Sequence, residues 1–151
     1  MKPSTTAVIA SILLSSVLTA CGDGSPTAAA PAVSKEIVKI NAGQLFTAYE
    51  DNEVATDEGL KGKLVQVSGS VQAIDKDAFD NIVINFKTSN QFMPAHMKME
   101  DSEKAAAMAI KKGSKATVLC EKMSRIVGTP YGNGCRFVAE DAPKPQKKTA
   151  G

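Results

Sequence analysis

The sequence predicts a mainly β domain of the α+β class, in which short strands form a small barrel accompanied by helices. Hydrophobic periodicity is the first observation behind this prediction, because short segments of alternating hydrophobicity are interrupted by segments of helical periodicity. Composition is the second, since 43% hydrophobic and 23% charged residues are typical of a soluble globular domain. The 151-residue chain also has compositionally biased ends, which leave about one hundred residues for a single core.

The first predicted element is a helix over residues 42–60. Four apolar residues follow one another at roughly helical spacing, so one stripe of this helix packs while the remainder is solvated. These residues are Leu45, Phe46, Tyr49 and Ala55. The acidic residues among them are interpreted as a solvated helix face, and the alternative is a partner-binding surface. They are Glu50, Asp51, Glu53, Asp57 and Glu58.

Three strands are predicted next. Residues 64–74 alternate in hydrophobicity, with a bend expected at Gly69. The residues on the shared face are Val65, Val67, Gly69 and Val71. Residues 82–86 form a second strand candidate and residues 92–99 a weaker third one.

A second helix is predicted over residues 101–112, where alanines favour helix formation and Asp101 or Ser102 can cap the N-terminus. Two short strands, residues 116–121 and 136–138, complete the domain. The resulting order is helix, three strands, helix, two strands. A helix between the third and fourth of five short strands is the order of an OB-fold, a partly open five-stranded Greek-key barrel.

Several segments carry a more specific resemblance. They are Gln44–Ala55, Leu60–Lys63, Val65–Val71, Lys112–Val118 and the two later cysteines. In these segments the chain resembles a family of exported bacterial OB-fold lipoproteins with a tRNA-anticodon-binding-like domain, and the Tyr-x-x-Asn-Glu-x-Ala motif at 49–55 is its most distinctive part. The resemblance covers residues 37–138. It implies the fold but not an activity, because one fold hosts many functions.

Residues 1–20 have the layout of a secretory signal, with a basic start, an apolar run and small residues at the end. The apolar run, residues 7–18, is shorter than the roughly 20 residues that a membrane-spanning helix needs. Residues 18–21, Leu-Thr-Ala-Cys, resemble the bacterial lipobox. We therefore expect cleavage before Cys21 and lipid on its thiol; the alternative is an unmodified Cys21 beside an ordinary cleavage site. Gly22, in place of an Asp, favours the outer membrane, with the domain facing the periplasm.

Four regions follow from composition. Residues 1–20 are the signal peptide, 21–35 a lipidated flexible linker of small residues and prolines, 36–141 the OB-fold domain, and 142–151 a disordered tail rich in Lys and Pro. The chain has a net charge of +2, but residues 36–141 contain 13 Lys and Arg against 15 Asp and Glu. A nucleic-acid-binding domain normally carries the opposite excess, so nucleic acid is a disfavoured partner.

Cys120 and Cys135 remain once Cys21 is lipidated, and an exported domain lies in an oxidising compartment. A structural disulfide between them is the favoured interpretation. A redox pair usually has closer Cys-x-x-Cys spacing, and a metal site needs two further ligands in a chain with one histidine.

Ligand-binding OB-folds use the face of strands 2 and 3, framed by the loops after strands 1 and 4. Residues 75–81 and 122–134 are predicted to form these two loops. Aromatic and basic residues near them are the candidate ligand-binding residues, although a core or hairpin role is the favoured interpretation for the aromatic ones. The candidates are Phe86, Phe92, Lys122, Arg125 and Tyr131.

Two metal interpretations are weaker. The carboxylates of residues 75–81 suggest calcium, but the spacing of a known calcium loop is absent and a polar turn is favoured. His96 has methionines nearby, as a copper site would, yet alternation places His96 on the opposite strand face from Met97 and Met99. We expect no metal and no cofactor.

The sequence contains no defensible catalytic constellation, so we expect a protein that is not an enzyme. The favoured function is a membrane-anchored binding or adaptor module for a protein or an envelope glycan. The alternative is binding of single-stranded nucleic acid, which only the analogy of the fold suggests.

Overall fold

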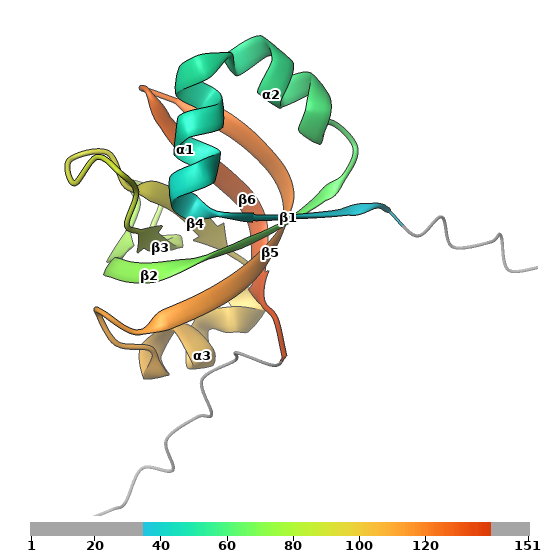
Figure 1. Ribbon diagram of the computed structural model, residues 1–151. Coiled ribbons are helices and arrows are strands. Elements are labelled where there is room, and N and C mark those ends of the chain that lie inside the picture. The colour runs from blue at the N-terminus through green and yellow to red at the C-terminus, as the bar shows by residue number, and fades with distance from the viewer. Residues whose placement is uncertain (1–34, 140–151) are drawn as a thin grey trace, which may run out of the picture. The chain divides into compact units, whose positions relative to one another are not determined.

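The computed structural model describes residues 35–139 (Figure 1). The predicted signal peptide, Cys21, the linker up to residue 34 and the tail lie outside the described residues. In the part of the chain that is described, no helix is long and apolar enough to cross a membrane. The elements, in order, are β1 (Ile37–Asn41), α1 (Ala42–Asp51), α2 (Glu53–Leu60), β2 (Leu64–Lys76), β3 (Ile82–Phe86), β4 (Ala95–Met99), a 3-10 turn η1 (Asp101–Glu103), α3 (Lys104–Ala109), β5 (Lys115–Ile126) and β6 (Thr129–Phe137).

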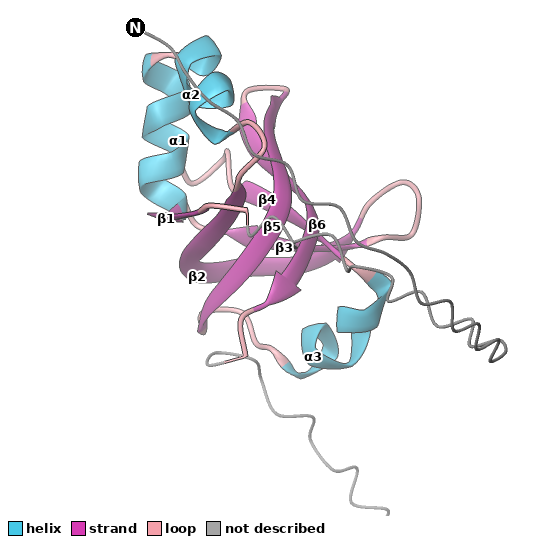
Figure 2. Cartoon of the chain, turned by 90° about the vertical axis from the view of Figure 1, so that its right-hand side faces the viewer, coloured by secondary structure: helices cyan, strands magenta, loops and turns pink. Residues whose placement is uncertain are grey.

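Five of the strands close into a barrel, which confirms the predicted OB-fold. Neighbouring strands follow the order β2-β3-β4-β6-β5, and a further pairing of β2 with β5 closes the ring. The β4–β6 pair is parallel and the other barrel pairs are antiparallel. Figures 1 and 2 show α1 and α2 at one end of the barrel and α3 at the other. α3 lies between the third and fourth barrel strands, as the sequence predicts.

Strand β2 belongs to both halves of the barrel. Residues 65–70 pair with β5 and residues 71–76 pair with β3, with a register irregularity between Val71 and Ala73. Gly69 lies just before this change of partner, and a Cβ atom there would come within 3.1 Å of the Phe86 ring. The missing side chain therefore lets the β2 backbone approach β3 closely.

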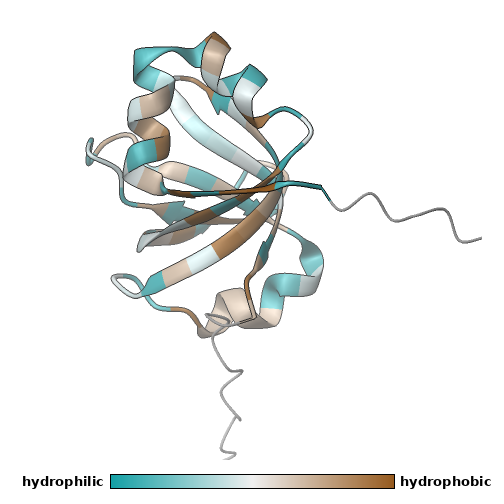
Figure 3. Cartoon of the chain, turned by 45° about the vertical axis from the view of Figure 1, so that its right-hand side comes forward, coloured by the Kyte–Doolittle hydropathy of each residue, from teal (hydrophilic) through white to brown (hydrophobic). Residues whose placement is uncertain are grey.

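The core lies inside the barrel and beneath α1. Val65, Val67 and Val71 are fully buried, which confirms the predicted inward face of β2. Leu45 and Tyr49 of α1 are buried with them in one cluster. The middle of β5 is hydrophobic and the helices at the end of the barrel carry hydrophilic segments (Figure 3). The apolar stripe of α1 thus covers an open end of the barrel.

The predicted helix over residues 42–60 is divided at Asn52. This residue has extended backbone angles, φ −162° and ψ 96°, and its side chain accepts a hydrogen bond from the Ala55 amide at 3.0 Å. Asn side chains compete with helical backbone hydrogen bonds and favour N-caps, which explains why a new helix begins here. Asn41 caps α1 in the same way, with Gln44 completing a capping box.

Arg125 of β5 connects the barrel to α1 and α2, which together we call the helical cap. Its Nη1 donates a hydrogen bond to the Tyr49 carbonyl oxygen at 2.9 Å, and its guanidinium forms ion pairs with Glu50 and Glu53. The Tyr49 hydroxyl donates to Asp57 at 2.9 Å, and burial, with this carboxylate beside it, raises the pKa of Tyr49. The Tyr-x-x-Asn-Glu-x-Ala motif therefore holds α1, α2 and β5 together.

The last two strands are much longer than predicted. The sequence predicts a loop over residues 122–134, whereas β5 and β6 pair through this region and are joined by Val127 and Gly128 alone. Its glycines and charged residues indicate a loop by composition, but pairing across the hairpin satisfies the backbone groups. The loop prediction is therefore wrong.

Other boundaries also differ. The edge strand β1 is not predicted, since five residues give little pattern and its parallel partner in β2 is distant in sequence. The predicted helix over 101–112 is a 3-10 turn followed by α3, and no side chain caps either. β2 extends to Lys76, and β4 begins at Ala95, three residues later than predicted.

The predicted disulfide between Cys120 and Cys135 is present. The two cysteines lie directly opposite each other in the β5–β6 pair. Gly132 lies beneath them, and a Cβ atom there would lie 2.7 Å from the Met97 sulfur and 2.8 and 2.9 Å from the cysteine sulfurs. Only glycine fits between the disulfide and β4, so this position determines how closely β4 and β6 pair.

We predict that replacing both cysteines by alanine lowers the free energy of unfolding by about 3 kcal/mol, because the unfolded chain loses a cross-link around a loop of about 15 residues. The melting temperature falls by about 15 °C. Thermal unfolding with and without reductant measures the change. The double variant serves as the control because it cannot respond to reductant; a native protein that is equally insensitive contradicts the prediction.

We predict that Gly132→Ala destabilises the domain by about 1–3 kcal/mol, because the added methyl group overlaps three sulfur atoms. Gly59→Ala is the matched control, since a Cβ atom at this position in α2 has nothing within 4 Å. It stabilises the domain by about 0.5–1 kcal/mol through helix propensity. Urea unfolding of both variants checks the pair, and equal effects of the same sign would contradict the packing argument.

Candidate functional site

The candidate site lies on the outer face of the barrel, where alternation along three strands brings polar side chains together. In β3, Ile84 and Phe86 point into the core, so Asn85 points outward. The register places Asn85 opposite His96 of β4, and His96 opposite Tyr131 of β6. Three residues that are distant in sequence therefore lie side by side.

A pocket of about 380 Å³ opens on this face, and we call it the outer-face pocket. The β2–β3 loop borders one side and the β5–β6 turn borders the other. It is the place where OB-folds bind oligonucleotides and oligosaccharides. The lining residues that matter below are Asp75, Asp77, Asn85, His96, Val127 and Tyr131.

Asp75, Asn85 and His96 form a hydrogen-bonded chain in this pocket. The Asn85 amide nitrogen donates to Asp75 Oδ2 at 2.6 Å, and the Asn85 amide oxygen lies 2.6 Å from His96 Nδ1. A carboxylate only accepts hydrogen bonds, so the Asn85 oxygen must face the histidine. His96 Nδ1 therefore carries the proton and Nε2 is left as an acceptor.

Burial fixes the charge of His96 as well. Its half-buried position lowers the pKa of His96 below 6.5, an effect that the nearby Asp75 carboxylate opposes. The imidazole is therefore neutral at neutral pH. Burial also raises the pKa of the Tyr131 hydroxyl, with the Asp77 charge adding to it, so the phenol stays protonated. The site combines a neutral imidazole, a phenol and carboxylates.

Asp77 organises the β2–β3 turn. Its Oδ1 accepts hydrogen bonds from the Phe79 amide at 2.9 Å and the Asn81 amide at 3.0 Å, and both carboxylate oxygens accept from the Asn81 side chain. These bonds, above all that from the Asn81 side chain, lower the pKa of Asp77. The segment is thus the polar turn that the sequence favours over a calcium loop. Within residues 35–139 no group of three or more His, Cys, Asp or Glu residues could hold a metal ion.

Two lysines near the pocket are placed against other carboxylates. Lys76 Nζ lies 2.5 Å from Asp80 Oδ1 and forms an ion pair with it. Asp80 is on the β2–β3 loop and does not belong to the hydrogen-bonded chain described above. The charge of Lys98 contributes to the low pKa of the Asp77 carboxyl, after the hydrogen bonds from Asn81 and Phe79. Among residues 35–139 no lysine or arginine forms an ion pair with Asp75. Among these residues the Asp75 carboxylate therefore accepts a hydrogen bond from Asn85 and forms no ion pair.

The structure separates the predicted ligand-binding residues. Tyr131 lines the outer-face pocket, whereas Lys122 lines a groove between α2 and β5. Phe86 is fully buried in the core and cannot stack on a ligand, because the parity of β3 turns its ring inward. Arg125 is 17% exposed and is bound to the helical cap. The five residues do not form one site, and the burial of Phe86 agrees with the core role that the sequence favours for it.

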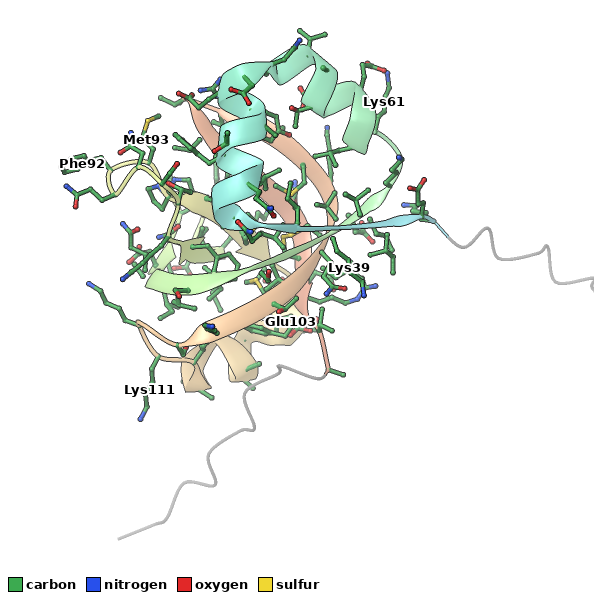
Figure 4. All side chains as sticks on the ribbon, viewed as in Figure 1. Lys39, Lys61, Phe92, Met93, Glu103 and Lys111 are labelled. Carbon is green, nitrogen blue, oxygen red and sulfur yellow. A yellow bond between two sulfur atoms is a disulfide. The ribbon has the colours of Figure 1, made fainter. Side chains whose placement is uncertain are left out.

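Phe92 belongs to a second pocket, of about 440 Å³, on the loop between β3 and β4. It is 83% exposed and shares this pocket with Lys87 and Lys112. Figure 4 shows Phe92 and Met93 on the same projecting loop. The side chain of Met93 instead approaches Gly128 of the β5–β6 turn.

Two site residues have only weak signals in the sequence. Asn85 is polar in an otherwise apolar strand, and Asp75 carries a charge at a strand end, but only the barrel register brings them to His96. The predicted separation of His96 from its methionine neighbours is confirmed, since Met97 and Met99 are buried inside the barrel. These methionines pack in the core.

Comparison with known proteins decides the family. A model of the tRNA_anti-like family matches residues 4–128, well over half of the chain. The chain belongs to the tRNA_anti-like family. The OB-fold lipoprotein resemblance predicted from the sequence is thereby confirmed.

This tRNA_anti-like chain is also similar to a solved structure described as a "putative nucleic acid-binding lipoprotein" from Klebsiella pneumoniae subsp. pneumoniae MGH 78578. The TM-score is 0.56 at 15% sequence identity, over 68% of this chain and 92% of the other. At this identity the similarity shows a shared fold. No curated protein matches the chain.

We predict that His96 titrates below pH 6.5 in the folded domain. Asp75→Asn lowers its pKa further, because the carboxylate that favours the imidazolium is gone, whereas Asp80→Asn, on the neighbouring loop, leaves it unchanged. His96 is the only histidine in the chain, so its ring proton gives one unambiguous NMR titration curve. A midpoint at or above 6.5 contradicts the prediction.

The lowered pKa of His96 also makes the stability of the domain depend on pH. The unfolded state takes up the proton near pH 6.5, above the folded pKa. The stability contribution of His96 is therefore complete above about pH 6.5 and declines as the pH falls from there toward the folded pKa.

Proposed function

We propose that this protein is a lipid-anchored, non-enzymatic binding module of the bacterial envelope, which binds a protein or an envelope glycan in the outer-face pocket. The observation that carries the proposal is the Asp75–Asn85–His96 chain, which holds polar groups in fixed orientations at the OB-fold ligand face. A pocket with a few fixed polar groups is typical of a recognition site.

The envelope location rests on the N-terminal sequence. Cys21 follows a signal-like leader with lipobox spacing, and each buried methylene of an attached lipid contributes about 0.8 kcal/mol to membrane residence. The similar Klebsiella pneumoniae protein is described as a lipoprotein, which supports the same placement. We place the domain at the outer membrane, facing the periplasm, because Gly22 follows the lipidated cysteine.

Single-stranded nucleic acid is the second candidate ligand. The Klebsiella pneumoniae protein is described as binding nucleic acid, and the second pocket combines the exposed Phe92 ring with Lys87 and Lys112. Stacking rings and cations are the groups that bind single strands. The outer-face pocket, however, contains Asp75 and Asp77, which repel phosphates. We therefore favour a partner that is not a polyanion.

Photo-crosslinking in intact cells tests the proposal. A photoreactive residue at Ile126, 47% exposed at the outer-face pocket, yields discrete adducts with an envelope component. Met108 on α3, 78% exposed, is the control position and yields none. Equal labelling at both positions, or none at either, contradicts the proposal.

A titration with fluorescent single strands at low salt, where phosphate contacts are strongest, tests the second candidate. We expect no binding by the native protein. Tight binding that is lost in a Lys87→Glu, Lys112→Glu variant would favour nucleic acid instead.

A further inference from the structure

The β5–β6 turn carries a residue that its backbone disfavours. Ile126 pairs with Thr129, so Val127 and Gly128 alone make the turn, with φ angles of +49° and +81°. Two positive φ angles are typical of a type I′ turn, in which Asn-Gly is the preferred pair. Valine is β-branched and is strained at positive φ. At 93% exposure, Val127 has no packing in the domain that offsets the strain.

Further apolar side chains are exposed on the loops that border the pocket. Phe79 is 86% exposed on the β2–β3 loop, and Ile126, beside Val127, is half exposed. Single exposed apolar side chains are common, but these occupy both loops that border one pocket. A strained, solvated valine at the rim of a binding site indicates a contact with a partner.

Among residues 35–139, two acceptors of the pocket have no lysine or arginine in an ion pair or hydrogen bond with them. The Asp75 carboxylate accepts from Asn85, and the imidazole of His96 presents Nε2 as an acceptor. Lys76, which also lines the pocket, is paired with Asp80. An ammonium or guanidinium group can donate to a carboxylate or to the acceptor nitrogen of an imidazole.

We infer that the outer-face pocket binds a lysine or arginine side chain of a protein partner, whose flanking apolar residues contact Val127, Ile126 and Phe79. This inference rests on the proposed function and narrows it to a protein. Exposed valine, isoleucine and phenylalanine side chains suit the apolar core of a protein interface. A carboxylate and an acceptor nitrogen both favour a partner group that donates hydrogen bonds and carries positive charge.

Short peptides test this directly on the mature chain carrying Cys21→Ser. The probes are three capped heptapeptides that differ only at their centre, Leu-Lys-Leu, Leu-Gln-Leu and Leu-Glu-Leu. We expect the lysine peptide to shift the NMR signals of His96 and Val127 and to bind at least ten-fold more tightly than the glutamate peptide. Equal binding of all three, or no binding by any, overturns the inference.

One turn variant and one matched pair of variants separate binding from folding. Val127→Asn relieves the backbone strain of the turn, so it raises the melting temperature by about 4–8 °C. The same variant binds the lysine peptide at least five-fold more weakly. Asp75→Asn lowers the affinity for the lysine peptide about ten-fold. Asp80→Asn, which removes a carboxylate paired with Lys76, leaves this affinity unchanged. A Val127→Asn variant that binds as well as the native protein overturns the inference.

An N-acetylglucosamine oligomer is the competing probe. If this oligomer shifts the NMR signals of His96 and Val127 and the lysine peptide does not, the inference of a protein partner is overturned and the proposed binding site stands. The crosslinks at Ile126 decide the proposed function independently, because they depend on no assumption about the ligand.

Discussion

The parallel pairing of β4 with β6 is the constraint on which the remaining structure depends. It joins β2, β3 and β4 to the β5–β6 hairpin, and it is possible because Gly132 leaves room for the Met97 side chain and the disulfide in one small volume. A parallel pair between strands from two different segments has no local turn to guide it. The disulfide holds β6 against β5 and so presents β6 to β4 in a fixed register.

The same pairing builds the site. Once the inward side of β4 is filled by Met97, alternation turns His96 outward, next to Tyr131 and Asn85. The core and the pocket are thus two faces of the same strands, and a register slip of one residue would exchange them. This explains why one disulfide and one glycine matter to a surface that neither contacts directly.

Two residues at the outer-face pocket, Asn85 and Val127, occupy environments that stability alone disfavours for their residue types. Asn85 is 7% exposed and is a buried polar residue, and it is tolerated because both ends of its amide are hydrogen-bonded. Val127 lies in a backbone conformation that stability alone would assign to Asn or Gly. Local departures from the rules of stable folding concentrate at functional sites, and here two of them border one pocket.

The sequence predicts the barrel because local patterns specify its strands, and the alternation of Val65, Val67 and Val71 is unambiguous. It misses β1 and most of the β5–β6 hairpin, since these depend on partners rather than on their own composition. The Val-Gly turn lacks the Asn-Gly signal of a hairpin.

The site is harder to predict than the fold. His96 and Asp75 are separated by 21 positions, and only the pairing of three strands shows that Asn85 joins them. Tyr131 is predicted, but for a loop rather than a strand. Phe86 fails as a candidate because a shift of one position along a strand separates the core from the pocket.

In the outer-face pocket, the Asp75–Asn85–His96 chain presents a neutral imidazole with Nε2 as an acceptor nitrogen. A long-range nitrogen–proton correlation spectrum of the native domain at neutral pH reads the tautomer of its one histidine directly. We expect a protonated Nδ1 and an unprotonated Nε2. A protonated Nε2, or an imidazolium at neutral pH, would contradict it.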